Sequence, residues 1–307
     1  MEHLSVTKEK RVHKTPVIIS ERDDAIIHAV YTYRYLTSEQ ITRLFFSKGS
    51  GSHVRVIIKS LSDAEYLYRF HLPVRTKGEI PYVYTLGSKG MKYLKRLETD
   101  GITRFRSTVS EVSYQHITHT LALNDMLIAA SLLCTSEPGI SLNDLRHEWY
   151  LKHTPLTVKV TNTSSSGKKA EIITVVPDAF LDFRFRVNGK YRGSPIWLEL
   201  DRGTEGVKQF KRKIRGLLTA VLSPQYEELF NTKAVTIAFA TTAEGNRLTH
   251  MREWVKQELT ELDKLAESSL FLFTKLPHGE LDPRTLYLAP TWYLPDDTTP
   301  LPLLDLT

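Results

Sequence analysis

Residues 195–201, PIWLELD, form an apolar run that ends in two acids, and no other stretch constrains the fold as much. Side chains alternate along a strand, so Glu199 and Asp201 should point to the same face of a sheet. An earlier apolar run, residues 173–187, carries Asp178. If the two runs pair as a hairpin, Asp178 comes near Glu199. We therefore expect a buried sheet with three acids gathered at one end.

Three carboxylates close together need a cation among them, because like charges repel and raise one another's pKa. Mg²⁺ prefers oxygen ligands of this kind, and the sequence predicts a magnesium site formed by Asp178, Glu199 and Asp201. The segment after these acids, RGTEGVKQFKRKI, has the spacing of a helix with one apolar and one basic stripe. Lys208 or Lys211 on the basic stripe would stabilise the charge that builds on a phosphate attacked by metal-activated water.

A second interpretation of the same acids needs no metal. Asp201, Arg202 and Glu205 would form ion pairs that stabilise the start of the following helix. Thr204 would then be the N-cap, with Glu205 in the first turn, where a negative charge interacts favourably with the helix dipole. The sequence leaves both interpretations open.

The body of the chain, residues 109–276, is a succession of strands and helices. A helix over 113–133 comes first, then three strand-like stretches, then helix, strand, helix and strand. Such an order predicts a mixed sheet with helices on both faces. Residues 277–307 hold six of the 14 prolines and predict an extended tail that packs onto the body or contacts a partner.

Residues 19–108 predict a helical module that ends in a hairpin and a closing helix. The third helix, 52–62, has a core-facing stripe at positions i, i+3, i+4 and i+7: Val54, Ile57, Ile58 and Leu61. Its other side carries four side chains able to meet phosphates and base edges: Ser52, His53, Arg55 and Lys59. The hairpin spans 66–86, with Arg75 and Lys77 at its tip. This order predicts a winged helix-turn-helix; a small protein-interaction domain is the alternative.

The positive charge of the chain is concentrated in its N-terminal third. Residues 1–110 carry 19 Lys and Arg against 11 Asp and Glu, a balance of +8, whereas residues 111–307 carry 22 against 24, a balance of −2. This asymmetry favours a nucleic-acid-facing module attached to a nearly neutral body.

The acids of the body resemble the PD-(D/E)xK nuclease core. A Pro-Asp pair is followed 21 residues later by an acid on the next strand, within an α-β-β-β-α-β order. Asp178 matches the motif Asp and Glu199 the second acid, but Asp201 stands where the motif has Lys. In this superfamily the Lys sometimes lies on the next helix, so the resemblance implies Lys208 or Lys211. Two more acids are candidates for the same site: Asp125 and Glu148.

The whole chain resembles a more specific family, the replication-relaxation proteins of plasmids and other mobile elements. The resemblance covers residues 20–275 and lies in YVYTLGSKGMKYL, HTLALND, PDA and LELDRGTE. It implies an accessory DNA-binding protein linked to plasmid replication or to the relaxation of DNA.

The remaining features limit the cellular setting. No apolar run approaches the ~20 residues of a transmembrane helix, and the N-terminal charges are not followed by the apolar segment of a secretory signal. Cys134 is the single cysteine, so neither a disulfide within the chain nor a cysteine zinc site is expected. We expect a cytoplasmic protein without a membrane partner.

Together these features predict a two-domain protein of mixed α and β structure. We expect an N-terminal tail (1–18), a winged helix-turn-helix domain (19–108), a PD-(D/E)xK-like mixed-sheet α/β domain (109–276) and a Pro-rich tail (277–307). The expected function is accessory or sequence-recognising binding of double-stranded DNA, with a non-cleaving nuclease-like domain and no cofactor. The alternative is a Mg²⁺-dependent endonuclease or nickase. A second copy of the chain or another protein of a mobile-element complex is a further expected partner.

Overall fold

The computed structural model describes residues 18–72, 81–99, 101–106, 112–164 and 167–306. The chain divides into two compact units, 1–128 and 129–307, and the boundary lies inside helix α5 (Tyr114–Ser136). Residues 1–17 of the expected N-terminal tail lie outside the described residues, as do Arg75 and Lys77 at the tip of the expected wing.

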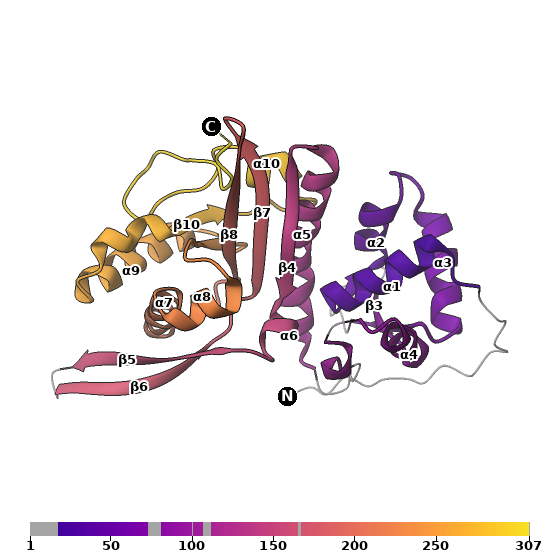
Figure 1. Ribbon diagram of the computed structural model, residues 1–307, viewed down its shortest axis with the longest axis horizontal. Coiled ribbons are helices and arrows are strands. Elements are labelled where there is room, and N and C mark those ends of the chain that lie inside the picture. Colours follow the sequence, from indigo (N-terminus) through magenta and orange to yellow (C-terminus); the bar gives the residue numbers. More distant parts are fainter. Residues whose placement is uncertain (1–17, 73–80, 100, 107–111, 165–166, 307) are drawn as a thin grey trace. The chain divides into compact units, whose positions relative to one another are not determined.

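The N-terminal unit combines helices with a small antiparallel sheet. Its helices are α1 (Glu21–Tyr33), α2 (Ser38–Phe45), α3 (Gly51–Asp63), α4 (Ser88–Arg96), the short 3-10 helix η1 (Ile102–Arg104) and the first part of α5. Its strands are β1 (Leu36–Thr37), β2 (Leu67–His71) and β3 (Tyr82–Leu86), paired in the order β1-β3-β2. The predicted succession of three helices, two paired strands and a closing helix is present (Figure 1).

Local signals in the sequence account for these elements. Ser20 caps α1 and Asp23 returns a bond to the Ser20 backbone, while Thr37 and Gln40 form the same capping box on α2. Each box satisfies backbone N–H groups that have no partner inside the helix. Helix α3 buries one stripe of its surface: Val54, Ile58 and Leu61.

The first part of α5 is bonded into the N-terminal unit by polar contacts. The Asn124 side-chain amide donates to the carbonyls of Tyr33, at 3.0 Å, and Tyr35, at 2.6 Å. Asp125 accepts from Arg43 at 2.7 Å. These contacts hold α5 against the segment between α1 and α2.

Helix α5 is long and apolar enough to pass a composition test for a membrane span, and within the described parts of the chain it alone does so. The core helix of a folded domain can pass the same test. The apolar side chains of α5 are enclosed by the protein: Ile117, Leu123, Met126, Leu127, Ile128 and Leu133 are all buried. An interior position therefore accounts for the composition of this helix.

The C-terminal unit contains two sheets and the helices that pack on them. Its main sheet contains β4 (Ile140–His147), β7 (Ala179–Val187), β8 (Lys190–Asp201), β9 (Thr236–Thr241) and β10 (Phe271–Lys275). A separate two-stranded sheet contains β5 (Leu156–Ser164) and β6 (Gly167–Val175). The helices are α6 (Glu148–Leu151), α7 (Val207–Val221), α8 (Pro224–Phe230), α9 (Arg247–Glu261), η2 (Leu265–Leu270) and α10 (Pro283–Tyr287).

The main sheet is mixed, as the succession of strands and helices predicts. Its order is β10-β9-β8-β7-β4, with β4, β7 and β8 antiparallel and β8, β9 and β10 parallel. Strands β7 and β8 form the hairpin expected from the two apolar runs, with Ala179 opposite Leu198. This register places Asp178 beside Glu199 at the end of the hairpin.

The first of those apolar runs is not one strand, and this part of the prediction is wrong. Strand β6 ends at Val175 and β7 begins at Ala179, and β6 pairs with β5 rather than with the main sheet. Proline lacks the N–H that a central strand must donate, so Pro177 separates the two strands and leaves Asp178 in the gap between them.

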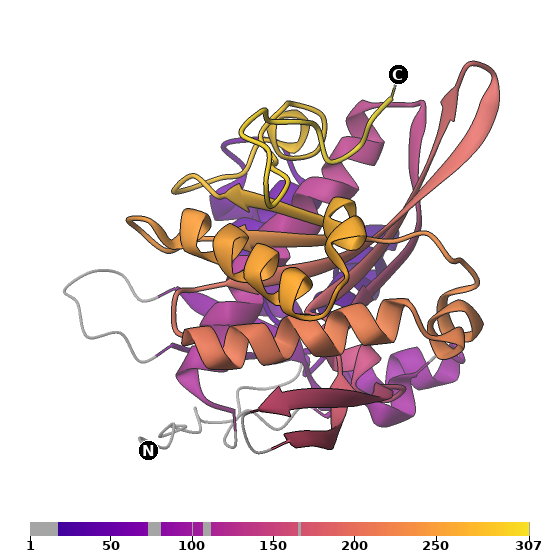
Figure 2. The same ribbon diagram turned by 90° about the vertical axis from the view of Figure 1, so that its left-hand side faces the viewer.

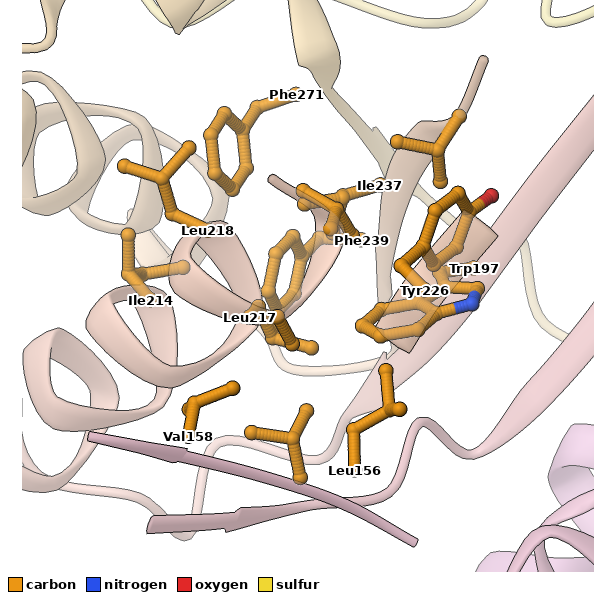
Figure 3. Packing of buried hydrophobic residues seen from close by; sticks show 14 of the residues in the cluster. Leu156, Val158, Trp197, Ile214, Leu217, Leu218, Tyr226, Ile237, Phe239 and Phe271 are labelled. Carbon is orange, nitrogen blue, oxygen red and sulfur yellow. The ribbon is translucent and has the colours of Figure 1, made fainter. Parts of the chain in front are cut away.

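Helix α7 lies between the two sheets and centres the core of this unit (Figures 1 and 2). One face of α7 packs on the main sheet through Ile214 and Leu217, and the β5–β6 hairpin covers α7 from the other side (Figure 3). A Cβ at Gly216 would lie 3.1 Å from the Ile173 side chain, so glycine permits this close approach of helix and hairpin. Helix α9 packs beside α7 on the same face of the main sheet.

The Pro-rich tail packs onto the body of this unit, one of its two expected fates. Trp292 is buried and its indole N–H donates to the Leu286 carbonyl at 2.7 Å. Tyr293 bridges to Phe273 of β10, and Tyr287 packs on Phe183 with ring centroids 5.3 Å apart. The tail thus packs against β7 and along the β10 edge of the main sheet, and Arg252 of α9 donates to its Leu294 carbonyl at 2.8 Å.

Candidate functional site

Two of the predicted acids meet where β7 begins and β8 ends. Asp178 precedes β7, and its Oδ2 accepts a hydrogen bond from the Leu200 backbone N–H at 2.8 Å. This bond holds Asp178 beside Glu199, the neighbour of Leu200 on β8. The approach of Asp178 to Glu199 that the hairpin predicts is therefore present, on the face of the sheet that α7 covers.

Glu199 is deeply buried and shares a lysine with a second glutamate. Its side chain is 4% exposed, and the Nζ of Lys213 on α7 lies 3.3 Å from its Oε2. The same Nζ lies 2.9 Å from Oε1 of Glu205, in the loop before α7. Burial raises the pKa of Glu199 to about 8; Lys213 lowers it, whereas Asp178 and Glu205 raise it.

Lys213 keeps its charge in this setting. Burial lowers its pKa, but the three surrounding carboxylates outweigh this effect and raise the pKa above its ordinary value. One ammonium cannot neutralise three carboxylates, so a proton on Glu199 reduces the excess negative charge while Lys213 remains protonated. The cluster of Asp178, Glu199, Glu205 and Lys213 is called the acid cluster below.

Asp201 has a different partner and does not join the acid cluster. Arg247, at the start of α9, binds it with two nitrogens, Nε at 2.9 Å from Oδ2 and Nη2 at 2.6 Å from Oδ1. The Gly203 backbone N–H and the Thr241 hydroxyl donate to Oδ2 at 3.0 and 2.9 Å. Asp201 is ion-paired, as the interpretation without a metal expects, and Arg247 binds it. The expected cap is wrong, because α7 begins at Val207 with Gly206 rather than Thr204 as its N-cap.

The predicted magnesium site does not fit this arrangement. Both carboxylate oxygens of Asp201 accept hydrogen bonds from Arg247, and Glu199 contacts Lys213. Among the described residues, no group of three or more His, Cys, Asp or Glu side chains is placed to hold a metal ion. Asp178, Glu199 and Asp201 therefore do not form one shared three-carboxylate site.

The lysine beside Glu199 is not one of the two predicted from the basic stripe of α7. Lys211 pairs with Glu261 of α9 at 2.8 Å, and Lys208 is exposed to solvent. Among the described residues, no ion pair joins either lysine to an acid of β8. Lys213 follows Phe210 by three positions and so borders the apolar stripe, which is the sequence signal that identifies it.

The two further acids proposed for the site lie elsewhere. Asp125 belongs to the N-terminal unit, where it accepts from Arg43 and Gln40. Glu148 begins α6, directly after the end of β4, and its side chain pairs with Lys152 at 2.5 Å. Its backbone N–H donates to the Asp178 carbonyl at 2.8 Å, so Glu148 supports the position of Asp178 through the main chain.

A second candidate surface lies in the N-terminal unit, on the exposed side of α3. The four side chains predicted for this surface are all exposed: Ser52, His53, Arg55 and Lys59. Between them lies Val56, an apolar side chain that is 67% exposed. Lys59 pairs with Asp63, one turn later on the same helix, at 2.5 Å.

The β2–β3 hairpin adds cations and aromatic rings next to α3. Burial raises the pKa of Tyr84 to about 12, while the nearby charges of Arg69 on β2 and Arg55 on α3 lower it. Tyr84 is thus within electrostatic range of a cation from each element, in keeping with the packing of α3 against β2. Arg69 also lies over the ring of Tyr82, with its guanidinium carbon 5.1 Å from the centroid.

The comparison with known families agrees with the resemblance in the sequence. The family model described as replication-relaxation matches residues 27–231, more than half of the chain. No curated protein and no solved structure shows a significant match to the chain. The match spans α3, the β2–β3 hairpin, the acid cluster and all of α7. The chain therefore belongs to the replication-relaxation family.

Proposed function

We propose that this protein is an accessory DNA-binding protein in the replication or relaxation of a plasmid or other mobile element. Its N-terminal unit would act as a winged helix-turn-helix on double-stranded DNA, with α3 as the recognition helix and the β2–β3 hairpin as the wing. The family supports the replication setting, and the order of helices and strands supports the winged-helix interpretation.

The adjoining positions of Arg55 and Arg69 carry this proposal. A winged helix needs cations on both the recognition helix and the hairpin, because phosphate contacts from two elements fix the protein's orientation on the duplex. Helix α3 packs against β2, and the charges of Arg55 and Arg69 both act on Tyr84, which supports a positive surface shared by the two elements. Val56 adds an apolar group at the centre of α3, suited to the methyl group of thymine.

The second unit, in this proposal, has a nuclease-like fold that does not cleave. The antiparallel β4, β7 and β8 with parallel β9 after helix α7 are in keeping with a nuclease-like core. Asp201 is held by Arg247, and Glu199, with its pKa of about 8, binds a proton at neutral pH. Acids in these states support the protein's structure and are poorly placed for chemistry on a phosphate.

One observation favours the alternative, an endonuclease. Lys213 contacts Glu199 and lies near Asp178. The PD-(D/E)xK motif has a lysine at the position that Asp201 occupies here, and Lys213 supplies a cation to the acid cluster from α7 instead. A lysine in that position could stabilise the negative charge that develops on an attacked phosphate. The two functions make different demands on the same three side chains.

Titration of a fluorescent duplex with the protein tests DNA binding. We expect Arg55→Ala and Lys59→Ala to weaken binding and each to lower the slope of log K against log salt by about 1. Lys256→Ala and Lys264→Ala, exposed cations of the second unit, serve as matched controls and should leave the slope unchanged. Equal effects of all four changes would contradict a DNA surface on α3.

Incubation with supercoiled plasmid, with and without Mg²⁺ or Mn²⁺, distinguishes the two functions. The proposal predicts no nicked or linear product from the wild-type protein under conditions where it shifts a duplex. The endonuclease predicts nicking that is lost in Asp178→Asn and in Lys213→Met. Retention of duplex binding by both variants would show that they remain folded.

A further inference from the structure

The end of the β7–β8 hairpin, which includes the turn and the paired strand ends beside it, carries an unusual concentration of positive charge. Residues 183–194 contain Arg184, Arg186, Lys190 and Arg192 and no acid, although residues 111–307 as a whole carry 22 Lys and Arg against 24 Asp and Glu. The hairpin lies in the unit that the sequence shows to be nearly neutral. This local charge takes no part in the acid cluster.

The end of the β7–β8 hairpin projects beyond the main sheet (Figures 1 and 2). Strand β4 pairs with β7 only as far as Phe185, and β9 pairs with β8 only from Ile196 onward. Arg186 to Arg192 therefore form a two-stranded ribbon with no further strand on either side. Asn188 and Gly189 both have positive φ, 49° and 77°, as in the tight turns that stiffen hairpins.

Three of the four cations are available to a ligand. Arg184 is used internally: it pairs with Asp182 at 2.7 Å and lies across Gly193, where a Cβ would collide with its guanidinium. Across the described part of the chain, no carboxylate pairs with Arg186, Lys190 or Arg192. Arg186 instead stacks on Tyr191, 4.4 Å from its centroid, and Tyr191 is 73% exposed.

The cations occupy both faces of the ribbon. Arg186 lies opposite Tyr191, whereas Lys190 and Arg192 lie opposite Val187 and Phe185, on the other face. Val187 and Phe185 are buried, so on that face the two cations are the groups exposed to a ligand. A flat acidic surface would meet only one of these faces. A groove of duplex DNA, which is wide enough for a two-stranded ribbon and has a phosphate backbone along each side, offers anions to both.

We propose that the β7–β8 hairpin tip is a second DNA-binding element, which enters a groove of the duplex and places Arg186, Lys190 and Arg192 against the flanking phosphates. The inference rests on the proposed function, because its ligand is the same double-stranded DNA. The tip is separate from the acid cluster: Glu199 follows Arg192 by seven positions along β8, roughly 20–25 Å. The second unit thus adds contacts to DNA without using its acids.

The triple variant Arg186→Ala/Lys190→Ala/Arg192→Ala tests the proposal in a duplex titration from about 50 to 200 mM salt. Its matched control is Lys233→Ala/Lys256→Ala/Lys264→Ala, with three exposed cations removed from the same unit. We expect the hairpin variant to bind at least tenfold more weakly at the lower salt, with a slope reduced by roughly 2 to 3. Arg186→Lys/Arg192→Lys should keep most of the slope.

The outcomes separate this proposal from the proposed function. Equal binding by the hairpin variant and its control, with Arg55→Ala still defective, would overturn the hairpin proposal alone. A defect in the hairpin variant with normal Arg55→Ala would support the hairpin and overturn the α3 surface. Absence of duplex binding by the wild-type protein would overturn both. Unchanged thermal unfolding of the variants shows that lost binding is not lost folding.

Discussion

Helices α3 and α7 are both basic in sequence, yet the structure gives their cations different roles. On α7 four cations are paired with acids from other elements: Lys211 with Glu261, Arg212 with Glu171, Lys213 with Glu199 and Glu205, and Arg215 with Glu258. On α3, Arg55 is exposed, and among the described residues Lys59 pairs with Asp63 of the same helix alone.

This difference teaches that a basic helix is a DNA-binding candidate only if its cations are not already paired with acids from other elements of the protein. On α7, Arg215 neutralises Glu258, which would otherwise lie buried and unpaired, while Lys211 and Arg212 pair with acids that are partly exposed. These pairings are a structural task. The α3 cations have no such task, so they remain available to phosphates. Changes on the two helices should therefore separate stability from binding.

The largest effect should come from Arg215→Ala. Glu258 has 0% side-chain exposure, and Arg215 is its ion-pair partner, so the change leaves a buried charge unpaired. We expect the free energy of unfolding to fall by about 3–5 kcal/mol, as measured by urea denaturation. Arg55→Ala, on an exposed face, should change it by less than about 0.5 kcal/mol.

The double variant Arg215→Met/Glu258→Leu is the control for this effect. It removes both charges and replaces them with apolar groups of similar size, so much of the lost stability should return. A loss as large as that of Arg215→Ala would mean that packing, rather than charge, explains the single variant.

The pH dependence of stability should reveal the proton on Glu199. Its pKa is about 8 in the folded protein against an ordinary value of 4.5, so between these values the folded state binds more protons than the unfolded state. Stability from this group is therefore present at low pH and lost as pH rises through 8, at no more than about 1.4 kcal/mol per pH unit.

Glu199→Gln cannot titrate and isolates this contribution. The difference in unfolding free energy between wild type and Glu199→Gln, measured by denaturation at several pH values, should shift against the wild type as pH rises from 5 to 8. A constant difference, or one of the opposite sign, would show that Glu199 is ionised throughout and that Lys213 dominates its environment.

Removal of paired cations from α7 should leave DNA binding intact. Arg212 is partly exposed but pairs with Glu171 at 2.5 Å, so Arg212→Ala is the closest match on α7 to Arg55→Ala on α3. We expect Arg55→Ala to lower the salt slope of duplex binding by about 1 and Arg212→Ala to leave it unchanged. The contrast between the helices would fail if both variants lost the same slope.

Much of the fold could be predicted because it follows from local periodicity. Helix α3 was expected at 52–62 and spans Gly51–Asp63, since its apolar spacing fits one face of a helix. The β7–β8 pairing follows from two apolar runs separated by a short polar turn. The placement of β5 and β6 on α7 could not be predicted, because their alternation is the same whichever surface they cover.

The candidate site could likewise be predicted only where its contacts follow from local pairing of strands. Asp178 and Glu199 meet because adjacent strands bring them together, and this is a local consequence of the hairpin. Arg247 of helix α9 binds Asp201 at the end of strand β8, 46 positions earlier in the sequence, and no local pattern pairs these two residues. Lys213 lay within reach of prediction, because its position relative to Phe210 places it at the edge of the apolar stripe.

The smallest effect should come from Asp63→Asn, which frees Lys59 from its partner on α3. An exposed i, i+4 ion pair is worth about 0.3–0.5 kcal/mol, and Asp63 lies at the C-terminal end of α3, where a negative charge is unfavourable with the helix dipole. The two terms nearly cancel, so denaturation should show a change below about 0.5 kcal/mol. Duplex affinity should rise a few-fold at low salt, because a carboxylate no longer competes with phosphate for Lys59. The gain should disappear in Asp63→Asn/Lys59→Ala, whereas a gain that persists there would trace to general charge rather than to Lys59.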